Sequence, residues 1–354
     1  MALFEVKPYD RQFYAENLRD FLPPQIIDIH THVWLDSFHN PEGGGRGDRV
    51  VLWPSLVAKD NSAEDLIETY RLMFPDKKVT PTVFGNPQPH DDLRLANRYV
   101  AESAGKYGFY PFYFSHPSEP AEPFEQSVLA GKFLGVKSYL NLAPDYIPQG
   151  EIRIYDFFPP HQLEVINRHG WLMMLHIPRD GRLRDRVNLA QMVEIEEKYP
   201  NIKLIIAHVG RAYAEEDVGD AFEFLSGCKK MLFDITANAN AQVFEQLLRA
   251  VGPDRVLFGS DMPILRLRAR RIVENGKYVN LVPPGLYGDV STDSHMREVS
   301  PAEAEKITFF MYEEIYAFKK AAEAAGLTPA EVEKVFYGNA KRLLDAVKHE
   351  TYGE

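Results

Sequence analysis

The fold is decided by the stretch Gln25-Ile26-Ile27-Asp28-Ile29-His30-Thr31-His32. Its apolar residues predict a strand that is buried on both faces, as in the parallel sheet of an α/β protein. An open, doubly wound sheet would usually follow its first strand with a glycine-rich turn that opens a helix. Here the strand ends in histidines, and the glycine run at 43–47 comes too late and opens no clear helix. We therefore expect a different parallel architecture, with polar chemistry at the strand end.

Seven further apolar segments follow along the chain, with amphipathic helical patterns between them. The first of these helical patterns begins at Ser62, a good N-terminal cap that is followed by acidic residues. Eight strands alternating with helices predict an α/β fold, the (β/α)8 TIM barrel, as one domain over residues 1–354. The doubly wound sheet is the alternative. The seven segments are residues 79–84, 109–114, 133–140, 171–176, 203–208, 231–236 and 255–261.

Two long insertions interrupt this alternation, at residues 33–61 and 262–300. We expect both to be loops on the barrel face where active sites form, so that they determine the substrate. Trp34, His39 and Trp53 of the first insertion are candidates to close over it. The second insertion holds the basic run Arg266–Arg271, which we expect to be a solvated surface. Two extra helices, 301–325 and 329–347, are predicted to end the chain.

Composition excludes several classes of protein. The 354 residues carry 40 Lys and Arg against 51 Asp and Glu, a formal net charge of −11, which argues against a nucleic-acid partner. The single cysteine, Cys228, excludes an intrachain disulfide framework. There is no signal-peptide pattern and no apolar run of about 20 residues, so we expect no membrane association and a cytoplasmic location. A homodimer is a reasonable expectation.

Polar residues at the strand ends predict a metal site. His30 and His32 lie two apart on a strand and therefore face the same side. His176 and His208 end the fifth and sixth predicted strands, and Asp261 ends the eighth. In a barrel these side chains would meet in one bowl. Imidazole and carboxylate ligands suit Zn²⁺ and similar divalent ions.

The chain resembles the amidohydrolase superfamily of metal-dependent TIM-barrel enzymes. Within it, the chain is most similar to the amidohydrolase-2 branch, which contains aminocarboxymuconate-semialdehyde decarboxylase and related hydrolases and hydratases. The matching pieces span nearly the whole chain: Ile27-Asp28-Ile29-His30-Thr31-His32, Gly135-Val136-Lys137, Leu175-His176, Ala207-His208-Val209-Gly210, Phe258-Gly259-Ser260-Asp261 and Tyr337-Gly338-Asn339-Ala340-Lys341-Arg342-Leu343-Leu344.

The resemblance implies roles for individual residues. His30, His32, His176 and Asp261 would hold one divalent metal ion, Zn²⁺ or alternatively Mn²⁺. Asp261 would also transfer a proton during the reaction. His208 would act as a catalytic partner or as a ligand of a second metal. Lys137 falls where some members carry a carboxylated lysine that bridges two ions; contact with the substrate is the alternative. Asp28 would support the ligands from behind.

Three residues are candidates for binding the substrate. Arg179 and Arg211 each follow a site histidine by three positions, and guanidinium groups bind carboxylates well. Tyr139 shares a strand face with Lys137. The expected partner is therefore a small molecule, which could carry a carboxylate.

These residues predict an enzyme, with the reaction left open. The first hypothesis is a metal-dependent hydrolase that uses an activated water on an amide, lactone or related ester. The alternative is a nonoxidative decarboxylase or hydratase of a small unsaturated or aromatic carboxylic acid. A non-catalytic binding barrel is disfavoured by the complete set of ligands. An arginine placed beside the metal would favour a carboxylate substrate.

Overall fold

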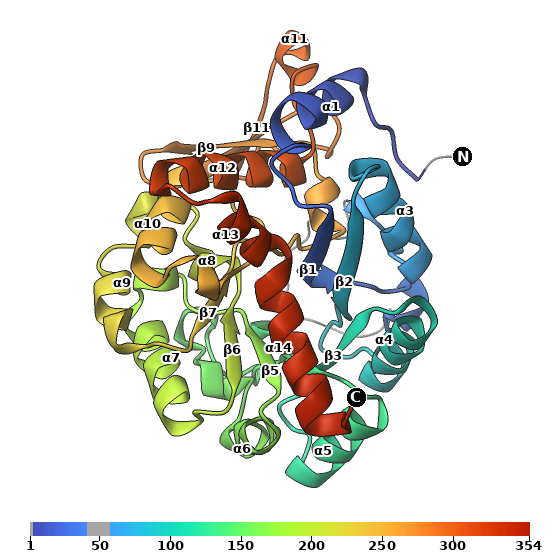
Figure 1. Cartoon of the computed structure of the whole chain (residues 1–354), viewed down its shortest axis with the longest axis vertical. Helices are drawn as coiled ribbons and strands as arrows, with labels where there is room; N and C mark the ends of the chain where they lie inside the picture. Colours follow the sequence, from blue (N-terminus) through green and yellow to red (C-terminus); the bar gives the residue numbers. More distant parts are fainter. Residues whose placement is uncertain (1–2, 41–56) are drawn as a thin grey trace.

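The computed structural model describes residues 3–40 and 57–354, and its centre is an eight-stranded parallel sheet (Figure 1). The strands pair in sequence order. The sheet closes because Ile29 donates its backbone N–H to Phe258 over 3.0 Å and Asp261 donates its own to His30 over 2.7 Å. The predicted (β/α)8 barrel is confirmed. The strands are β1 (Gln25–His32), β2 (Lys78–Phe84), β3 (Tyr110–Phe114), β4 (Gly135–Lys137), β5 (Leu172–Leu175), β6 (Lys203–Ile206), β7 (Leu232–Asp234) and β8 (Val256–Leu257).

Several strands are shorter than the apolar runs that predicted them. The run at 133–140 contains only the three residues of β4, and the run at 255–261 only the two of β8. The remaining apolar residues of each run are buried, or half-buried in the case of Tyr139, without pairing as strand. Hydrophobicity reports burial, and the ladder stops where the chain turns outward at the carboxyl end of the barrel.

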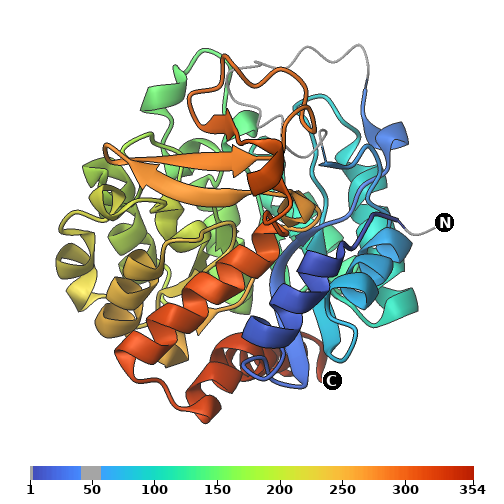
Figure 2. The same ribbon diagram turned by 90° about the horizontal axis from the view of Figure 1, so that it is seen from above.

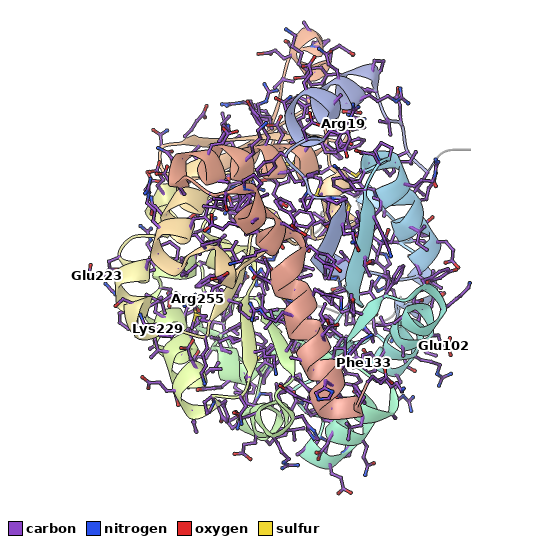
Figure 3. The ribbon with its side chains drawn as sticks, in the orientation of Figure 1. Arg19, Glu102, Phe133, Glu223, Lys229 and Arg255 are labelled. Atoms are coloured by element: carbon purple, nitrogen blue, oxygen red, sulfur yellow. The ribbon has the colours of Figure 1, made fainter. Side chains whose placement is uncertain are left out.

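Helices form the outer ring. Ser62 caps α3 as predicted, accepting the N–H of Asp65 at 3.0 Å. Charged side chains such as Glu102, Glu223 and Lys229 lie on the outer surface (Figure 3). The ring and its shorter turns are α3 (Ala63–Met73), α4 (Leu93–Tyr107), α5 (Ala121–Ala130), α6 (Pro160–His169), α7 (Arg186–Lys198), α8 (His208–Arg211), α9 (Ala221–Phe224), α10 (Ala241–Val251) and α12 (Phe310–Ala325).

The termini cover the barrel from outside. Each of the two predicted C-terminal helices is divided in the structure. The first consists of α11 (Pro301–Ala304) and α12. The second consists of α13 (Pro329–Glu333), a π-helical turn (Lys334–Gly338) and α14 (Asn339–Val347). Helix α14 crosses one end of the barrel, where it contacts β1, β5 and β8 (Figure 1). Near the N-terminus, α1 (Pro8–Phe13) packs beside the second insertion (Figure 2).

The sequence predicted a loop for the second insertion, and this prediction was wrong. The insertion contains a three-stranded sheet that lies over the opposite end of the barrel from α14 (Figure 2). Strand β9 (Arg270–Glu274) pairs antiparallel with β10 (Lys277–Val282), which pairs parallel with β11 (Met296–Glu298). The Asn275-Gly276 turn between β9 and β10 has positive φ at both residues, a strong hairpin signal.

The basic run Arg266–Arg271 is also not a solvated surface. Arg268 is buried and forms a two-pronged ion pair with Asp10 of α1, with distances of 2.9 and 2.7 Å. The prediction was wrong because charge alone does not reveal a buried counter-ion elsewhere in the sequence. Arg268 thereby fastens the inserted sheet to the N-terminal helix.

The first insertion is described only at its two ends. Its glycine run at 43–47 and Trp53 lie outside the described residues. Trp34 is buried, and its indole N–H donates to the carbonyl of Lys59 at 2.9 Å. His39 pairs with Asp91 at 2.7 Å. Neither Trp34 nor His39 is among the residues that line the cavity described next.

Candidate active site

A cavity of about 270 Å³ opens at the carboxyl ends of the barrel strands. His32 and Lys137 are the last residues of β1 and β4, His176 directly follows β5, and His208 begins α8 directly after β6. The inserted sheet supplies another wall of this cavity. The full lining is His30, His32, Asn86, Pro87, Gln88, Phe114, Lys137, Tyr139, Leu140, Asn141, Gln149, His176, Pro178, Arg182, His208, Arg211, Tyr213, Ala237, Asp261, Ile264, Leu265, Leu267, Arg271, Tyr278, Asn280 and Phe310.

Three of the predicted ligands form a compact cluster. One ligand atom each from His30, His32 and Asp261 lies within 4.8 Å of the other two, and all three residues are buried. Asp261 Oδ1 is 3.1 Å from His32 Nε2 and 3.5 Å from His30 Nε2. Two imidazoles and a carboxylate converging on one point suit a borderline divalent metal ion.

Second contacts hold the imidazole rings of the site in a defined orientation. The Nδ1 atoms of His30, His32 and His208 lie 2.9 to 3.1 Å from Asp234 Oδ2, the Gly85 carbonyl and the Thr236 carbonyl respectively. A carbonyl or carboxylate oxygen only accepts, so each Nδ1 carries the hydrogen. The Nε2 atom of each ring is left with its lone pair, as metal binding requires.

His176 differs from these three histidines because its Nδ1 atom has no hydrogen-bond partner among the described residues. It lies outside the three-residue cluster, but its ring centroid is 5.2 Å from that of His208 and 4.7 Å from that of Tyr139. Its Nδ1 atom is buried. An unpartnered buried nitrogen is costly unless a ligand takes its lone pair. The residues present therefore fit a metal ion held by His30, His32 and Asp261, and the unpartnered Nδ1 atom makes His176 a candidate for a further ligand.

Strained backbone places several of these side chains. Eight described residues other than glycine have positive φ, and five of them line the cavity: Arg182, His208, Arg211, Ala237 and Asp261. Each such residue costs on the order of 1–3 kcal/mol, which the surrounding structure must offset. This concentration at one cavity is typical of a functional site.

Gly259 allows the last strand to close against the ligands. A Cβ atom at this position would lie 2.8 Å from the Cβ of His30 and would also meet Thr236 Oγ1. Asp28, beneath the site, accepts the N–H of Ser260 at 2.9 Å and the hydroxyl of Tyr70 at 2.7 Å. Asp28 thus joins β1 to the segment that follows β8, which is the supporting position expected for it.

Burial sets the charges of the site. Burial lowers the pKa of His208 to about 4 and that of His176 well below its ordinary value. Burial alone would raise the pKa of Asp261, but the neighbouring imidazoles of His32, His30 and His208 hold it below its usual range. Neutral imidazoles beside an ionised carboxylate are the protonation states that bind a divalent cation.

Two predicted substrate-side cations reach the cavity. Lys137 is buried, with its Nζ atom 5.8 Å from the ring centres of Phe84 and Tyr139, and burial lowers its pKa to about 8. Arg211 is held by Nη1 hydrogen bonds to the carbonyls of residues 177–179, and its positive charge helps to lower the pKa of His176.

The third predicted cation lies elsewhere. Arg179 is not among the lining residues, and its Nη2 atom donates to the carbonyl of Glu151 at 3.4 Å. Tyr139, by contrast, lines the cavity as expected.

Two parts of the site are missing from the sequence prediction. Asp234 ends β7 and accepts from His30 Nδ1 and, at 2.6 Å, from the N–H of His208. In the predicted strand 231–236, Asp234 lies two residues before the end, so its carboxylate was a weaker signal than that of Asp261, which ends its predicted segment. The wall formed by Arg271, Tyr278 and Asn280 could not be predicted from the sequence, because it depends on an inserted sheet that was expected to be a loop.

Comparisons with known proteins agree with this architecture. The family model described as Amidohydrolase matches residues 27–346. A search of curated proteins returned no match. Among solved structures, an amidohydrolase from Burkholderia multivorans with bound zinc is 14% identical, with a TM-score of 0.53 over 91% of this chain and 99% of that one.

Two decarboxylases share the fold. The 2,6-dihydroxybenzoate decarboxylase from Rhizobium is 14% identical, with a TM-score of 0.51 over 92% of this chain and 99% of that one. A dihydroxybenzoic acid decarboxylase from Polaromonas sp. JS666, with bound manganese and the inhibitor 2-nitroresorcinol, is 16% identical, with a TM-score of 0.53 over 93% of this chain and 99% of that one.

Within the described residues, no helix has both the length and the apolar character needed to cross a membrane.

Proposed function

Because the chain belongs to the amidohydrolase family, we propose that it is a metal-dependent enzyme that decarboxylates a small carboxylic acid without an oxidant. One observation carries the proposal. The cavity that gathers His30, His32 and Asp261 also contains the guanidinium of Arg211 and the ammonium of Lys137. A carboxylate entering it would meet a ligand cluster and two cations, which is the arrangement that favours an acid as substrate.

The metal would be held by His30, His32 and Asp261, with the Nδ1 atom of His176 completing the set. Zinc in the amidohydrolase from Burkholderia multivorans and manganese in the decarboxylase from Polaromonas support a divalent ion here. When bound, such an ion supplies Lewis-acid polarisation of substrate oxygens and lowers the pKa of a coordinated water.

The protein's own residues would carry the remaining steps. Arg211 and Lys137 orient the substrate. Asp261, which rests ionised, takes up a proton from solvent and passes it to the carbon that bears the carboxylate. The carbon–carbon bond then breaks, its electron pair stays with that carbon, and carbon dioxide leaves. Asp261 is ionised again at the end, so the balance is that the substrate carboxylate and one proton from solvent give carbon dioxide and a product with hydrogen in place of the carboxylate.

Hydrolysis of an amide, lactone or ester is the second candidate. It is favoured by the same Asp261 carboxylate, which the neighbouring imidazoles hold in its ionised form, ready to accept a proton from water. Asp261 would then pass that proton to the leaving group. The two reactions differ in their products, although they use the same ligands.

The test follows from that difference. Protein loaded with Zn²⁺ or Mn²⁺ would be incubated with panels of aromatic and unsaturated carboxylic acids and of lactones, in water enriched in ¹⁸O. Release of carbon dioxide without incorporation of ¹⁸O into the organic product supports decarboxylation. Incorporation without carbon dioxide supports hydrolysis instead. Metal-loaded protein that turns over neither panel, or protein that binds no divalent metal, contradicts the proposal.

A further inference from the structure

The inserted sheet brings a fourth cationic group into the cavity. Arg271 lies on β9 and lines the cavity together with Tyr278 and Asn280 of β10. Its guanidinium is packed among three rings, 4.5 Å from the ring centres of Tyr278 and Phe310 and 4.9 Å from that of Tyr213. Stacking on aromatic faces fixes the plane of the guanidinium and favours the positive charge.

Two hydrogen bonds fix Arg271 further. Its Nε atom donates to Asn280 Oδ1 at 2.9 Å, and Nη1 donates to the carbonyl of Ala237 at 2.7 Å. Among the described residues, nothing accepts a hydrogen bond from Nη2. The side chain is therefore held rigidly while one terminal nitrogen is left for a ligand, which is the preorganised state that makes anion binding efficient.

The charge of Arg271 is not compensated. The part of the chain that the structure describes places no carboxylate within 4.0 Å of it. Its neighbour Arg182 differs, because Arg182 Nη1 pairs with Asp217 at 2.6 Å. Glu314 is close enough to influence Arg271, but neither of its buried carboxylate oxygens has a hydrogen-bond partner among the described residues, and burial raises the pKa of Glu314 well above its ordinary value, which favours the neutral form. A half-buried, fixed cation without a counter-ion favours the binding of an anion from outside.

This cation is separate from the one near the ligand cluster. Arg211 acts electrostatically on both His176 and Tyr213, whereas Arg271 is packed on Tyr213 and Tyr278 beside Arg182 and is not among the groups that shift the pKa of His176. The cavity thus contains Lys137 and Arg211 on the metal side and Arg271, beside the ion-paired Arg182, on the wall made by the inserted sheet. Its volume, about 270 Å³, limits the occupant to a small molecule that touches both sides.

Resting on the proposed function, we propose that the substrate is a dianion with two acidic groups. One carboxylate reacts beside His30, His32 and Asp261, and the second acidic group binds Arg271, flanked by Tyr213 and Tyr278. Arg271 is then the residue that determines specificity between mono-acids and di-acids. The inserted sheet, and not the barrel, carries that selection.

The test compares probes of the same shape and different charge. Isophthalate and its monoamide, 3-carbamoylbenzoate, and glutarate and its monoamide would be titrated into the metal-loaded protein by calorimetry. At least one di-acid is expected to bind about ten-fold or more tightly than its monoamide. Arg271→Met should remove that preference, with Kd for the monoamide and the metal content unchanged. Arg271→Lys should restore part of it.

Arg297→Met is the matched control. Arg297 lies in the same inserted sheet, half exposed, paired with Glu274 at 2.7 Å and not lining the cavity. The Arg297→Met variant should keep the preference for the di-acid over its monoamide. The inference is overturned if wild-type protein shows no preference in either pair, or if the preference survives Arg271→Met. Loss of metal binding or of turnover would instead contradict the proposed function, since the charge preference is measured without a reaction.

Discussion

Asp234 connects two histidines of the site through its two oxygens. Its Oδ2 atom accepts from Nδ1 of His30 at 2.9 Å, and its Oδ1 atom accepts the backbone N–H of His208 at 2.6 Å. Asp234 is fully buried, and the neighbouring His30 helps to keep its pKa low although burial opposes this. One carboxylate thus fixes the tautomer of one ring and the backbone position of the other.

Replacing this carboxylate by an amide should weaken metal binding. Asp234→Asn keeps the shape but removes the charge that orients His30, so we expect metal affinity to fall about 10- to 100-fold. Competition with a chelator measures this. Asp254→Asn, at an exposed ion pair with Lys334, is the control and should have no effect. Equal metal affinity in wild type and Asp234→Asn would show that the contact does not support the metal.

The Asp261→Asn variant tests the proton-transfer group. Asp261 contacts both ligand imidazoles, so its loss removes a metal ligand and the proton carrier together. We expect turnover to fall by at least about 10²-fold, the scale of general acid–base catalysis, and the melting temperature to stay close to that of wild type. Rates and thermal unfolding would be measured on the same preparation. Retained turnover would remove Asp261 from both roles.

The number of metal ions bound per chain tests whether Lys137 bridges two of them. Lys137 is buried beside Phe84 and Tyr139, and no carboxylate lies within 4.0 Å of its Nζ atom in the described parts of the chain. We expect about one metal equivalent per chain, and Lys137→Met should leave that value unchanged while reducing turnover of a carboxylate substrate. Elemental mass spectrometry of protein purified without chelators checks both. Two equivalents that fall to one or none in the variant would establish a bridging lysine instead.

The barrel was predictable because its signals are local. The eight apolar runs, the cap at Ser62 and the strand-end positions of His30, His32, His176, His208 and Asp261 need only the period of a strand and the geometry of a barrel. These features place the catalytic end of the molecule without knowledge of any distant contact. Asp234 lay inside the predicted segment 231–236, and its position at the end of a strand became clear only in the structure.

The selective wall of the cavity was not predictable in this way. Arg268 and Arg271 stand three apart in one basic run, yet one pairs with Asp10 of the N-terminal helix and the other is packed among Tyr213, Tyr278 and Phe310. Their roles depend on partners distant in sequence. Specificity was therefore the part that needed the three-dimensional structure.

The pair formed by His39 and Asp91 predicts a pH-dependent stability. The hydrogen bond to Asp91 raises the pKa of His39 above 6.5. A group whose pKa is higher in the folded state contributes stability that is present below its unfolded pKa and is lost as pH rises through the folded value. His39→Gln should therefore reduce the free energy of unfolding by about 0.5–1 kcal/mol at pH 5.5 and by less at pH 8.

His116 provides a control of opposite sign. Burial lowers its pKa, so protonation favours the unfolded chain, and wild type should lose stability relative to His116→Gln as pH falls below about 6.5. Urea unfolding of wild type and both variants at pH 5.5 and 8 measures the two differences. Their pH dependences should have opposite signs. A His39→Gln effect of the same size at both pH values would show that the pair stabilises the fold without its charge.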